Sequence, residues 1–318
     1  MRLSVQAGII IWILLTITIF NMKAQDRKGE YDHRSIHSSR YWLDIDYVGD
    51  GVIGHQLDIH LPGSGTGPFP IVIAIYGSAW FSNSSKANTF RDGLGQVLLE
   101  NGFAVVSINH RSSKDALFPA QIHDVKAAVR FVRARANEFD LDTNFLAVTG
   151  WSSGGHLAAM TGVTSFLPKR LEDGQTNDLE GNLGSFTGFR SDVDAVIDWY
   201  GPTNFLIMDT CGSSFSHDEA GSPESSLIGG PIQENHQKCA LANPVNYVHP
   251  GVPPFMIIHG DKDPLVPLCQ SEILQKRLQA EKIRNEFVIV EGGGHGPGVM
   301  IPEYYAQMID FLKRVKEK

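Results

Sequence analysis

The pattern of apolar and polar positions along the chain predicts strands that alternate with helices. Two short alternating runs, residues 41–48 and 55–61, flank Gly49-Asp50-Gly51 and predict a hairpin. The run 71–75 is continuously apolar and β-branched at every position except Ala74, which is typical of a central strand buried on both faces. Further strands are expected at 104–108, 145–149, 195–200, 255–259 and 286–291, and helices at 94–100, 119–132, 271–280 and 302–316. This alternation indicates an α/β fold with a mostly parallel sheet covered by helices on both faces.

Two stretches interrupt the alternation and are expected to form cap insertions. Residues 164–191 and 201–250 are rich in small and polar residues and carry no sustained apolar period. In open α/β sheets ligands bind beyond the carboxyl ends of the strands, and we place both insertions there. In the second stretch His217 and Glu224, with their turn-forming neighbours, are interpreted as surface turn residues, with a contribution to the pocket as the alternative.

The N-terminus has the pattern of a signal peptide. Arg2 precedes an apolar run over residues 7–20, which is shorter than the roughly 20 residues that a membrane span needs. We expect cleavage after Ala24, then a flexible polar segment over 25–40 and one folded domain over 41–318. The alternative is that the apolar run stays as an uncleaved membrane anchor. Either way the folded part is expected outside the cytoplasm, secreted or periplasmic, and after cleavage no stable membrane span is expected.

The net charge of the chain and the spacing of its cysteines indicate which partners, metal sites and disulfides to expect. The 318-residue chain has 27 basic and 35 acidic residues, a net charge of −8 and no basic cluster, so nucleic acid is not an expected partner. None of the three cysteines has C-x-x-C spacing, so we expect no metal or dithiol site. In an oxidising compartment we expect Cys211 and Cys239 to form a disulfide across the second insertion and Cys269 to stay free, although spacing alone leaves the other pairings open.

The segment Gly150-Trp151-Ser152-Ser153-Gly154 is the strongest candidate for chemistry. It has G-x-S-x-G spacing, follows the apolar run 145–149 and opens a run of small residues typical of a helix start. A strand that turns directly into a helix needs a tight turn with glycine at Gly150 and Gly154. Such a turn exposes the central serine at a helix N-terminus, which favours developing negative charge. We therefore predict that Ser152 is a nucleophile.

A serine nucleophile needs a base and an acid, and two later loops supply candidates. His295 stands among glycines directly after the last predicted sheet strand, and we predict that it is the base. Asp261 and Asp263 follow the preceding strand. Asp263 is the predicted acid, Asp261 is the second choice, as a turn-forming residue, and Asp198 is a third option. The order Ser, Asp, His along the chain is that of one known hydrolase fold.

An oxyanion formed during acyl transfer needs backbone N–H donors close to the serine. Ser153, directly after Ser152, is expected to supply one of them. Gly77 and Ser78, which follow the strand 71–75, are expected to supply the others. These three residues form the predicted oxyanion hole.

Three aromatic residues near these positions are candidates for binding substrate. Trp80, Phe81 and Trp151 could pack against an acyl group or the face of a sugar. For Trp80 a place in the hydrophobic core is an equal alternative.

Six segments carry a resemblance to a known family. They are Tyr76-Gly77-Ser78-Ala79-Trp80, Asn109-His110-Arg111 with Phe118-Pro119-Ala120, Gly150-Trp151-Ser152-Ser153-Gly154-Gly155-His156, Asp261-Lys262-Asp263-Pro264-Leu265-Val266-Pro267 and Gly294-His295-Gly296. Over residues 41 to 316 the chain resembles α/β-hydrolase esterases, in particular hormone-sensitive-lipase-like esterases and bacterial feruloyl and acetylxylan esterases. Tyr76 and Ser78 depart from the family pattern His-Gly-Gly-x-Trp, and serine is less free in φ than glycine.

The resemblance implies a secreted serine carboxylic ester hydrolase that works through an acyl-enzyme and needs no cofactor. The implied substrates are small-molecule or oligosaccharide esters, above all plant polysaccharide fragments that carry acetyl or feruloyl groups. One alternative is an amide-cleaving hydrolase, a peptidase or formamidase, of the same fold. The other is a non-catalytic, hydrolase-like binding protein.

Overall fold

The computed structural model describes residues 35–91, 93–167 and 178–317. The chain divides into two compact units, Met1–Ile36 and His37–Lys318, and the fold below is that of the second unit. The predicted signal peptide and most of the polar segment after it lie outside the described residues. Residues 38–40, which we expected to be flexible, already belong to the first strand.

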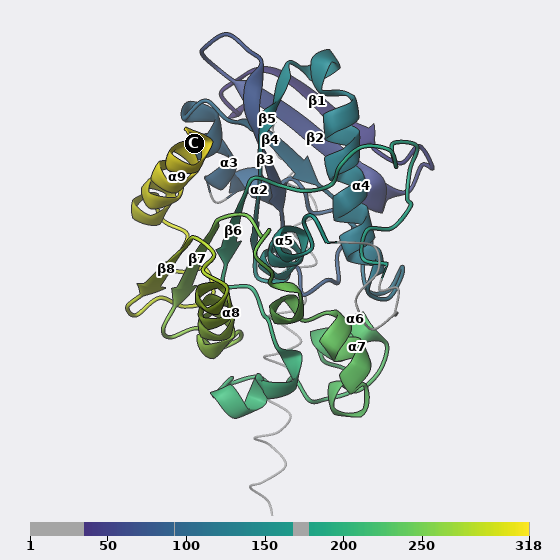
Figure 1. Ribbon diagram of the computed structural model, residues 1–318, viewed down its shortest axis with the longest axis vertical. Coiled ribbons are helices and arrows are strands. Elements are labelled where there is room, and N and C mark those ends of the chain that lie inside the picture. Colours follow the sequence, from purple (N-terminus) through teal and green to yellow (C-terminus); the bar gives the residue numbers. More distant parts are fainter. Residues whose placement is uncertain (1–34, 92, 168–177, 318) are drawn as a thin grey trace, which may run out of the picture. The chain divides into compact units, whose positions relative to one another are not determined.

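Eight strands in the described part of the chain form one sheet, in the order β1-β2-β4-β3-β5-β6-β7-β8 (Figure 1). The strands are β1 Ser38–Asp46, β2 Gln56–Pro62, β3 Phe69–Ile75, β4 Ala104–Ile108, β5 Leu141–Trp151, β6 Ala195–Trp199, β7 Phe255–Gly260 and β8 Asn285–Val290. The predicted hairpin of β1 and β2 is antiparallel, and β2 is also antiparallel to β4. All other neighbouring strands are parallel, which confirms the predicted fold class.

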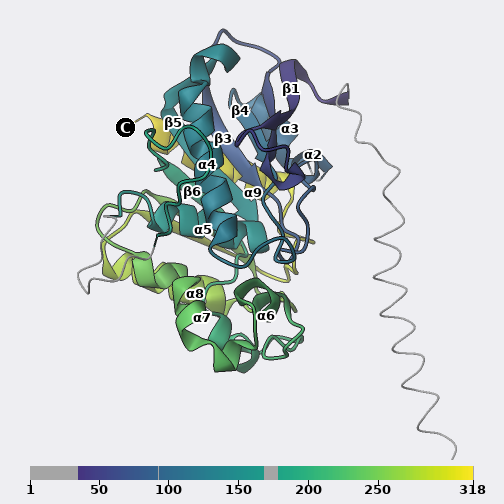
Figure 2. The same cartoon turned by 90° about the vertical axis from the view of Figure 1, so that its right-hand side faces the viewer.

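Helices cover both faces of this sheet. They are α2 Asn88–Arg91, α3 Leu94–Glu100, α4 Ala120–Ala134, α5 Ser153–Val163, α6 Pro223–Ile228, α7 His236–Leu241, α8 Cys269–Ala280 and α9 Pro302–Lys316. Helix α4 packs against α5, and α3 packs against α9. Figure 2 shows the first pair on one side of the strands and the second pair on the other. Among the described residues, no helix combines the length and the apolar character that crossing a bilayer would require.

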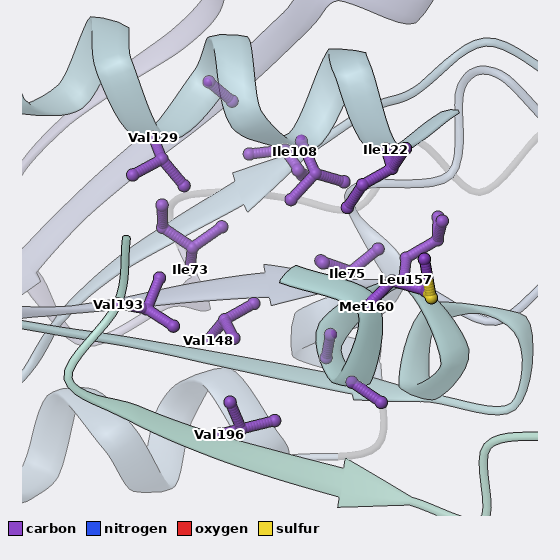
Figure 3. Packing of buried hydrophobic residues seen from close by; sticks show 14 of the residues in the cluster. Ile73, Ile75, Ile108, Ile122, Val129, Val148, Leu157, Met160, Val193 and Val196 are labelled. Atoms are coloured by element: carbon purple, nitrogen blue, oxygen red, sulfur yellow. The ribbon is translucent and has the colours of Figure 1, made fainter. Parts of the chain in front are cut away.

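The hydrophobic core lies between the central strands and the helices α4 and α5. Val129 of α4 points toward Ile73 of β3 and Val148 of β5, and Ile122, two turns earlier on the same helix, lies beside Leu157 (Figure 3). Leu157 of α5 packs into the same cluster, and all five side chains are fully buried. Burial of this kind stabilises by about 1.5–3 kcal/mol for each aliphatic side chain. This core fixes β3 and β5, whose ends carry the loops that matter below.

The second insertion contains more regular structure than its composition predicts. It holds α6 and α7 and short 3-10 turns, among them η4 Phe205–Ile207 and η5 Asp209–Cys211. Helix α6 begins with the hydroxyl of Ser222 accepting the N–H of Ser225 and with Pro223 in its first turn, both of which favour a helix start. These helices are too short to show a helical period in the sequence. In Figures 1 and 2 they lie at the bottom, opposite the end that holds β1.

The described part of the first insertion, residues 178–191, packs against α4. Glu180 accepts hydrogen bonds from Arg130 at 2.6 Å and from Lys126 at 3.0 Å, and its carboxylate also accepts the hydroxyl of Ser191 at 2.6 Å. The two basic side chains are buried, and the single negative charge of Glu180 compensates part of their two positive charges. This part of the insertion is therefore fastened to a helix on the face of the sheet.

Candidate active site

Ser152 lies in the turn between β5 and α5. Its φ of 55° and ψ of −125° are a backbone conformation that residues other than glycine rarely adopt. A side chain at Gly150 would place its Cβ 2.2 Å from the carbonyl oxygen of Gly154, and one at Gly154 would lie 2.2 Å from that of Ile75. Both positions therefore require glycine. The N–H of Ser152 donates to the carbonyl of Trp199 at 2.9 Å and helps to hold the strained residue.

Three loops bring Ser152, His295 and Asp263 into one hydrogen-bonded row. Nε2 of His295 lies 2.9 Å from Oγ of Ser152, and Nδ1 of His295 lies 2.7 Å from Oδ2 of Asp263. The loops follow β5, β7 and β8, and parallel strands present their carboxyl ends at one edge of the sheet. The Asp263 side chain is fully buried, whereas 20% of the His295 side chain is exposed. This arrangement can move a proton from the serine to the imidazole and stabilise the imidazolium that results.

Three further groups, together with His295, determine the charge state of Asp263. Its Oδ1 accepts the N–H of Leu265 at 2.9 Å and the N–H of Val266 at 3.0 Å. The buried His259, which sequence analysis did not single out, places Nε2 3.4 Å from Oδ2. Burial alone would raise the pKa of Asp263, but the hydrogen bonds and charges of His259 and His295 hold this pKa well below its usual range. Asp263 is therefore a fixed carboxylate.

The other two candidate acids bond to the backbone instead. Asp261 accepts the N–H of Gly292 at 2.6 Å and so ties the loop after β7 to the loop that carries the histidine. Asp198 accepts the N–H of Gly201 at 2.9 Å, and burial raises the pKa of Asp198 to about 6. Of the three predicted candidates, the structure brings Asp263 to the imidazole. Across the described residues, no group of three or more histidine, cysteine or acidic side chains is arranged to hold a metal ion.

Tyr200 packs against the imidazole of His295, a contact that sequence analysis missed. The two ring centroids lie 4.8 Å apart, with an angle of 62° between the ring planes. The Tyr200 hydroxyl donates to the sulfur of Met300 at 3.0 Å, and its backbone has a φ of 45°. The place of Tyr200 directly after β6, at the edge where the other site loops lie, was the available signal in the sequence. The ring limits the orientations open to the imidazole.

The loop after β3 approaches the Ser152 turn closely. A Cβ at Gly77 would lie 2.6 Å from the carbonyl oxygen of Trp151, so only glycine fits there. The N–H of Ser78 donates to Oγ of Ser153 at 2.8 Å, and so it is not free to hold an oxyanion, contrary to our prediction. The N–H groups of Ala79 and Ser153 have no acceptor within the described part of the chain.

Of the three aromatic residues predicted to bind substrate, Trp80 belongs to the core. It is 1% exposed, and its ring lies edge-on to those of His156 at 5.3 Å and Phe205 at 5.6 Å. The alternative interpretation of Trp80 is therefore the correct one. Phe81 is 37% exposed and Trp151 is partly exposed, and their contact with substrate stays a prediction.

The predicted disulfide between Cys211 and Cys239 is wrong. Cys211 of η5 is bonded to Cys269, the first residue of α8, and the two Cα atoms lie 6.2 Å apart. Cys239 of α7 is a buried free thiol that contacts the carbonyl of Ile232, and burial raises the pKa of this thiol to about 11. The fold brings η5 to the start of α8, which spacing along the chain does not reveal. The bond thus joins the second insertion to the element that follows the Asp263 loop.

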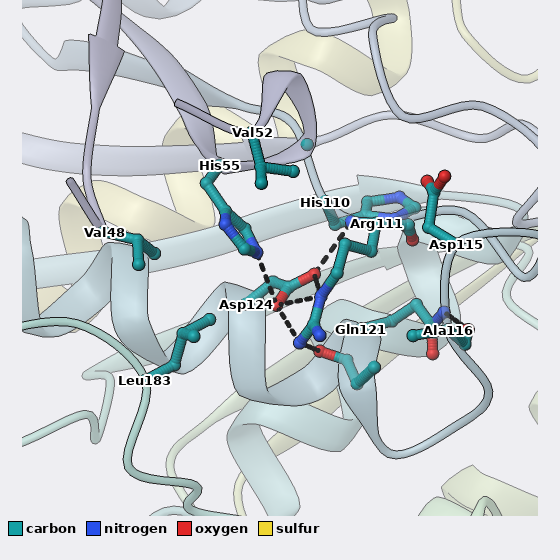
Figure 4. A network of polar contacts seen from close by, with 12 residues as sticks. Val48, Val52, His55, His110, Arg111, Asp115, Ala116, Gln121, Asp124 and Leu183 are labelled. Carbon is teal, nitrogen blue, oxygen red and sulfur yellow. Dashed lines mark hydrogen bonds and ion pairs between the residues drawn. The ribbon is translucent and has the colours of Figure 1, made fainter. Parts of the chain in front are cut away.

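A buried network of charges supports the loop after β4 (Figure 4). Asp124 of α4 accepts a hydrogen bond from Nη2 of Arg111 at 2.6 Å and lies 3.3 Å from Nε2 of His55. Nδ1 of His55 faces the carboxylate of Asp50 at 2.9 Å. Burial disfavours the charged form of His55, but the two carboxylates raise its pKa above the ordinary value. The network ties the β1–β2 hairpin to α4 and to the loop after β4 that contains Arg111.

Comparison with known proteins places this geometry among esterases. The chain matches the BD-FAE family over residues 57–278. It is 42% identical to a solved structure described as a truncated form of carbohydrate esterase from gut microbiota, with a TM-score of 0.84, over 89% of this chain and 99% of that one. A bifunctional GH43-CE protein of Bacteroides eggerthii is 46% identical, with a TM-score of 0.81, over 86% of this chain and 38% of that one.

Curated relatives share the same region at lower identity. Esterase LipC of Mycobacterium tuberculosis is 29% identical over 232 residues, which are 73% of this chain and 54% of LipC. The chain thus spans about half the length of the curated relatives it matches. The similarity concerns the hydrolase domain.

Proposed function

Because the chain belongs to the BD-FAE family of α/β-hydrolase esterases, we propose that it is a serine carboxylic ester hydrolase that removes acyl groups from carbohydrate esters. The observation that carries the proposal is the hydrogen-bonded row of Ser152, His295 and Asp263. The similar structure described as a carbohydrate esterase supports a carbohydrate-linked ester as substrate. Acetyl and feruloyl esters of plant polysaccharide fragments are the substrates that we propose.

The proposed reaction follows from the positions of these three side chains. Oγ of Ser152 attacks the ester carbonyl while its proton passes to Nε2 of His295. The bond to the alcohol then breaks, and His295 returns the proton to the leaving oxygen. A water molecule activated by His295 hydrolyses the acyl-enzyme. Asp263 keeps the second ring proton on Nδ1 and stabilises the charged imidazole throughout.

The oxyanion is held by backbone amides on both sides of the nucleophile. We assign one donor to Ser153, at the N-terminus of α5, where the helix dipole also favours negative charge. In the loop after β3, Ala79 replaces Ser78 as the proposed partner of Gly77, because the Ser78 amide is already engaged. Phe81, which is exposed in the same loop, is proposed to contact the acyl group or the sugar.

We also propose that the protein works outside the cytoplasm. The disulfide between Cys211 and Cys269 supports this, because disulfides persist in oxidising compartments. The sequence pattern of residues 1–24 supports it independently. N-terminal sequencing of the exported protein tests it: a start after Ala24 is expected, and a retained apolar run would favour an anchor.

The experiment for the activity is a panel of esters with a matched inactive variant. Acetylated xylo-oligosaccharide and methyl ferulate are the test substrates, and p-nitrophenyl acetate, butyrate and octanoate report on chain length. The wild-type chain should release acetate or ferulate, and Ser152→Ala should lose turnover by a factor on the order of 10⁴ or more while it stays folded. Turnover of amides without esters would favour the amide-cleaving alternative, and binding without turnover would favour a binding protein.

A further inference from the structure

The second insertion contains a buried ion pair that the reaction described above does not use. Nδ1 of His217 lies 2.9 Å from Oε2 of Glu224, the second residue of α6, and the two side chains are only 5% and 4% exposed. Both residues were interpreted as surface turn residues, and the structure contradicts this. Burying an ion pair carries a desolvation cost, so its partners and position need a physical reason.

The contacts of His217 show which protons its ring carries. On the other side of the ring, Nε2 lies 2.9 Å from the carbonyl oxygen of Leu265 and 3.0 Å from Oγ of Ser213. The Ser213 hydroxyl itself donates to the same carbonyl at 3.1 Å. A carboxylate and a carbonyl can only accept, so the imidazole satisfies both by donating from both nitrogens, as a cation. Burial opposes this charge, but the hydrogen bond and the charge of Glu224 raise the pKa of His217.

The carbonyl that His217 reaches belongs to the peptide that holds Asp263. The C=O of Leu265 and the N–H of Val266 are two ends of one peptide unit, and this N–H donates to Oδ1 of Asp263 at 3.0 Å. A hydrogen bond from a cation to the carbonyl end polarises the peptide and strengthens its N–H as a donor. A continuous row therefore runs from Glu224 through His217 and this peptide to Asp263.

Other bonds fasten the same insertion to the same loop. The N–H of Ser214 donates to the carbonyl of Pro264 at 2.9 Å, and the Cys211–Cys269 disulfide lies at the end of the loop. The N–H of His217 is itself fixed by the carboxylate of Asp209 at 2.7 Å. The insertion is thus positioned so that the ring of His217 meets the Leu265 carbonyl.

We propose that His217 and Glu224 are positioning residues for the acid of the triad: cationic His217, held by Glu224, fixes the Leu265–Val266 peptide and through it the orientation of Asp263 toward His295. The inference rests on the proposed function, because it concerns the same site. The charged groups that face His217 are Glu224 of α6, Asp209 of η5 and, across the peptide, Asp263. Loss of the His217 proton at alkaline pH breaks the row at its centre.

The test compares Glu224→Gln and His217→Gln with the wild-type chain. Turnover of p-nitrophenyl acetate is measured from pH 5 to 10, with kcat and KM determined separately. Loss of one hydrogen bond to a charged group should lower kcat about 10- to 100-fold, with KM unchanged within about twofold. Glu224→Gln should move the alkaline decline of kcat to lower pH by about one unit or more, and His217→Gln should remove that decline.

The matched control is His55→Gln, which breaks another buried imidazole–carboxylate pair. His55 is as buried as His217 but bonds to Asp50 and Asp124. His55→Gln should lower the melting temperature and leave kcat and its pH profile as in the wild type. Equal effects of His55→Gln and His217→Gln on the pH profile would overturn the proposal.

Two further measurements keep the outcomes distinct. If Ser152→Ala retains turnover, the proposed function fails; if Ser152→Ala is inactive but Glu224→Gln matches the wild type in kcat and pH profile, the positioning role fails alone. Nitrogen-15 spectra of the histidines in the wild-type chain address protonation without any substitution in the pair. Two protonated ring nitrogens on His217 at pH 7 are expected, and a neutral ring there would overturn the proposal.

Discussion

Removal of the Cys211–Cys269 bond tests how the second insertion is held to the rest of the domain. The two cysteines are separated by 58 residues, and closing a loop of this size restricts the unfolded chain by about 4 kcal/mol in the chain-entropy model. A domain of this size loses about 2–4 °C of melting temperature for each kcal/mol, so Cys211→Ala should melt about 8–16 °C below the wild type. Cys239→Ala is the matched control, because it truncates a buried thiol without breaking a bond and should cost about 1 kcal/mol.

The assay is thermal unfolding followed by circular dichroism, with and without a thiol reductant. The reductant should bring the wild type and Cys239→Ala down to the range of Cys211→Ala and leave Cys211→Ala itself unchanged. A melting temperature for Cys211→Ala within about 2 °C of the wild type would refute the reasoning, because it would mean that the bond does not stabilise the fold by restricting the unfolded chain. So would an equal loss in Cys239→Ala.

Three further predictions concern single positions. Asp263→Asn should lower kcat by a factor on the order of 10⁴, because it fixes the wrong tautomer of the base, whereas Asp261→Asn should cost less than about tenfold; equal losses in ester assays would reverse the assignment. Gly154→Ala should yield inactive, destabilised protein because its Cβ would lie 2.2 Å from the carbonyl oxygen of Ile75, and wild-type melting and turnover would contradict this. The raised pKa of His55 gives stabilisation that is complete below its unfolded value, about 6.5, and is lost as pH rises through the folded value. Urea unfolding from pH 6 to 9 should show this decline in the wild type and not in His55→Gln.

Local patterns were sufficient for the features that depend on neighbouring residues. The continuous apolar run of β3 and the two-turn spacing of Ile122 and Val129 on α4 reflect burial within single elements. The turn around Ser152 could likewise be predicted from the sequence, since contacts close to the strand end require glycine at Gly150 and Gly154. These features fixed the fold class and the order of the site loops.

Contacts between segments that are distant along the chain could not be predicted from the sequence in the same way. The pairing of Cys211 with Cys269 depends on where η5 meets α8, and no spacing rule encodes that distance. The capture of the Ser78 amide by the Ser153 hydroxyl depends on how two loops meet at the edge of the sheet. Likewise, His217 in a glycine- and serine-rich stretch resembles a surface residue until the insertion folds over it.

The most direct test of the central claim, that Ser152 is the nucleophile, is reaction with diethyl p-nitrophenyl phosphate followed by mass spectrometry. The wild-type chain should release one equivalent of p-nitrophenol, lose ester turnover in parallel and carry one diethylphosphoryl group, which peptide mapping places on Ser152. Ser152→Ala, folded as judged by circular dichroism, should carry none. A phosphoryl group on another residue, or full turnover by a chain modified at Ser152, would contradict the account.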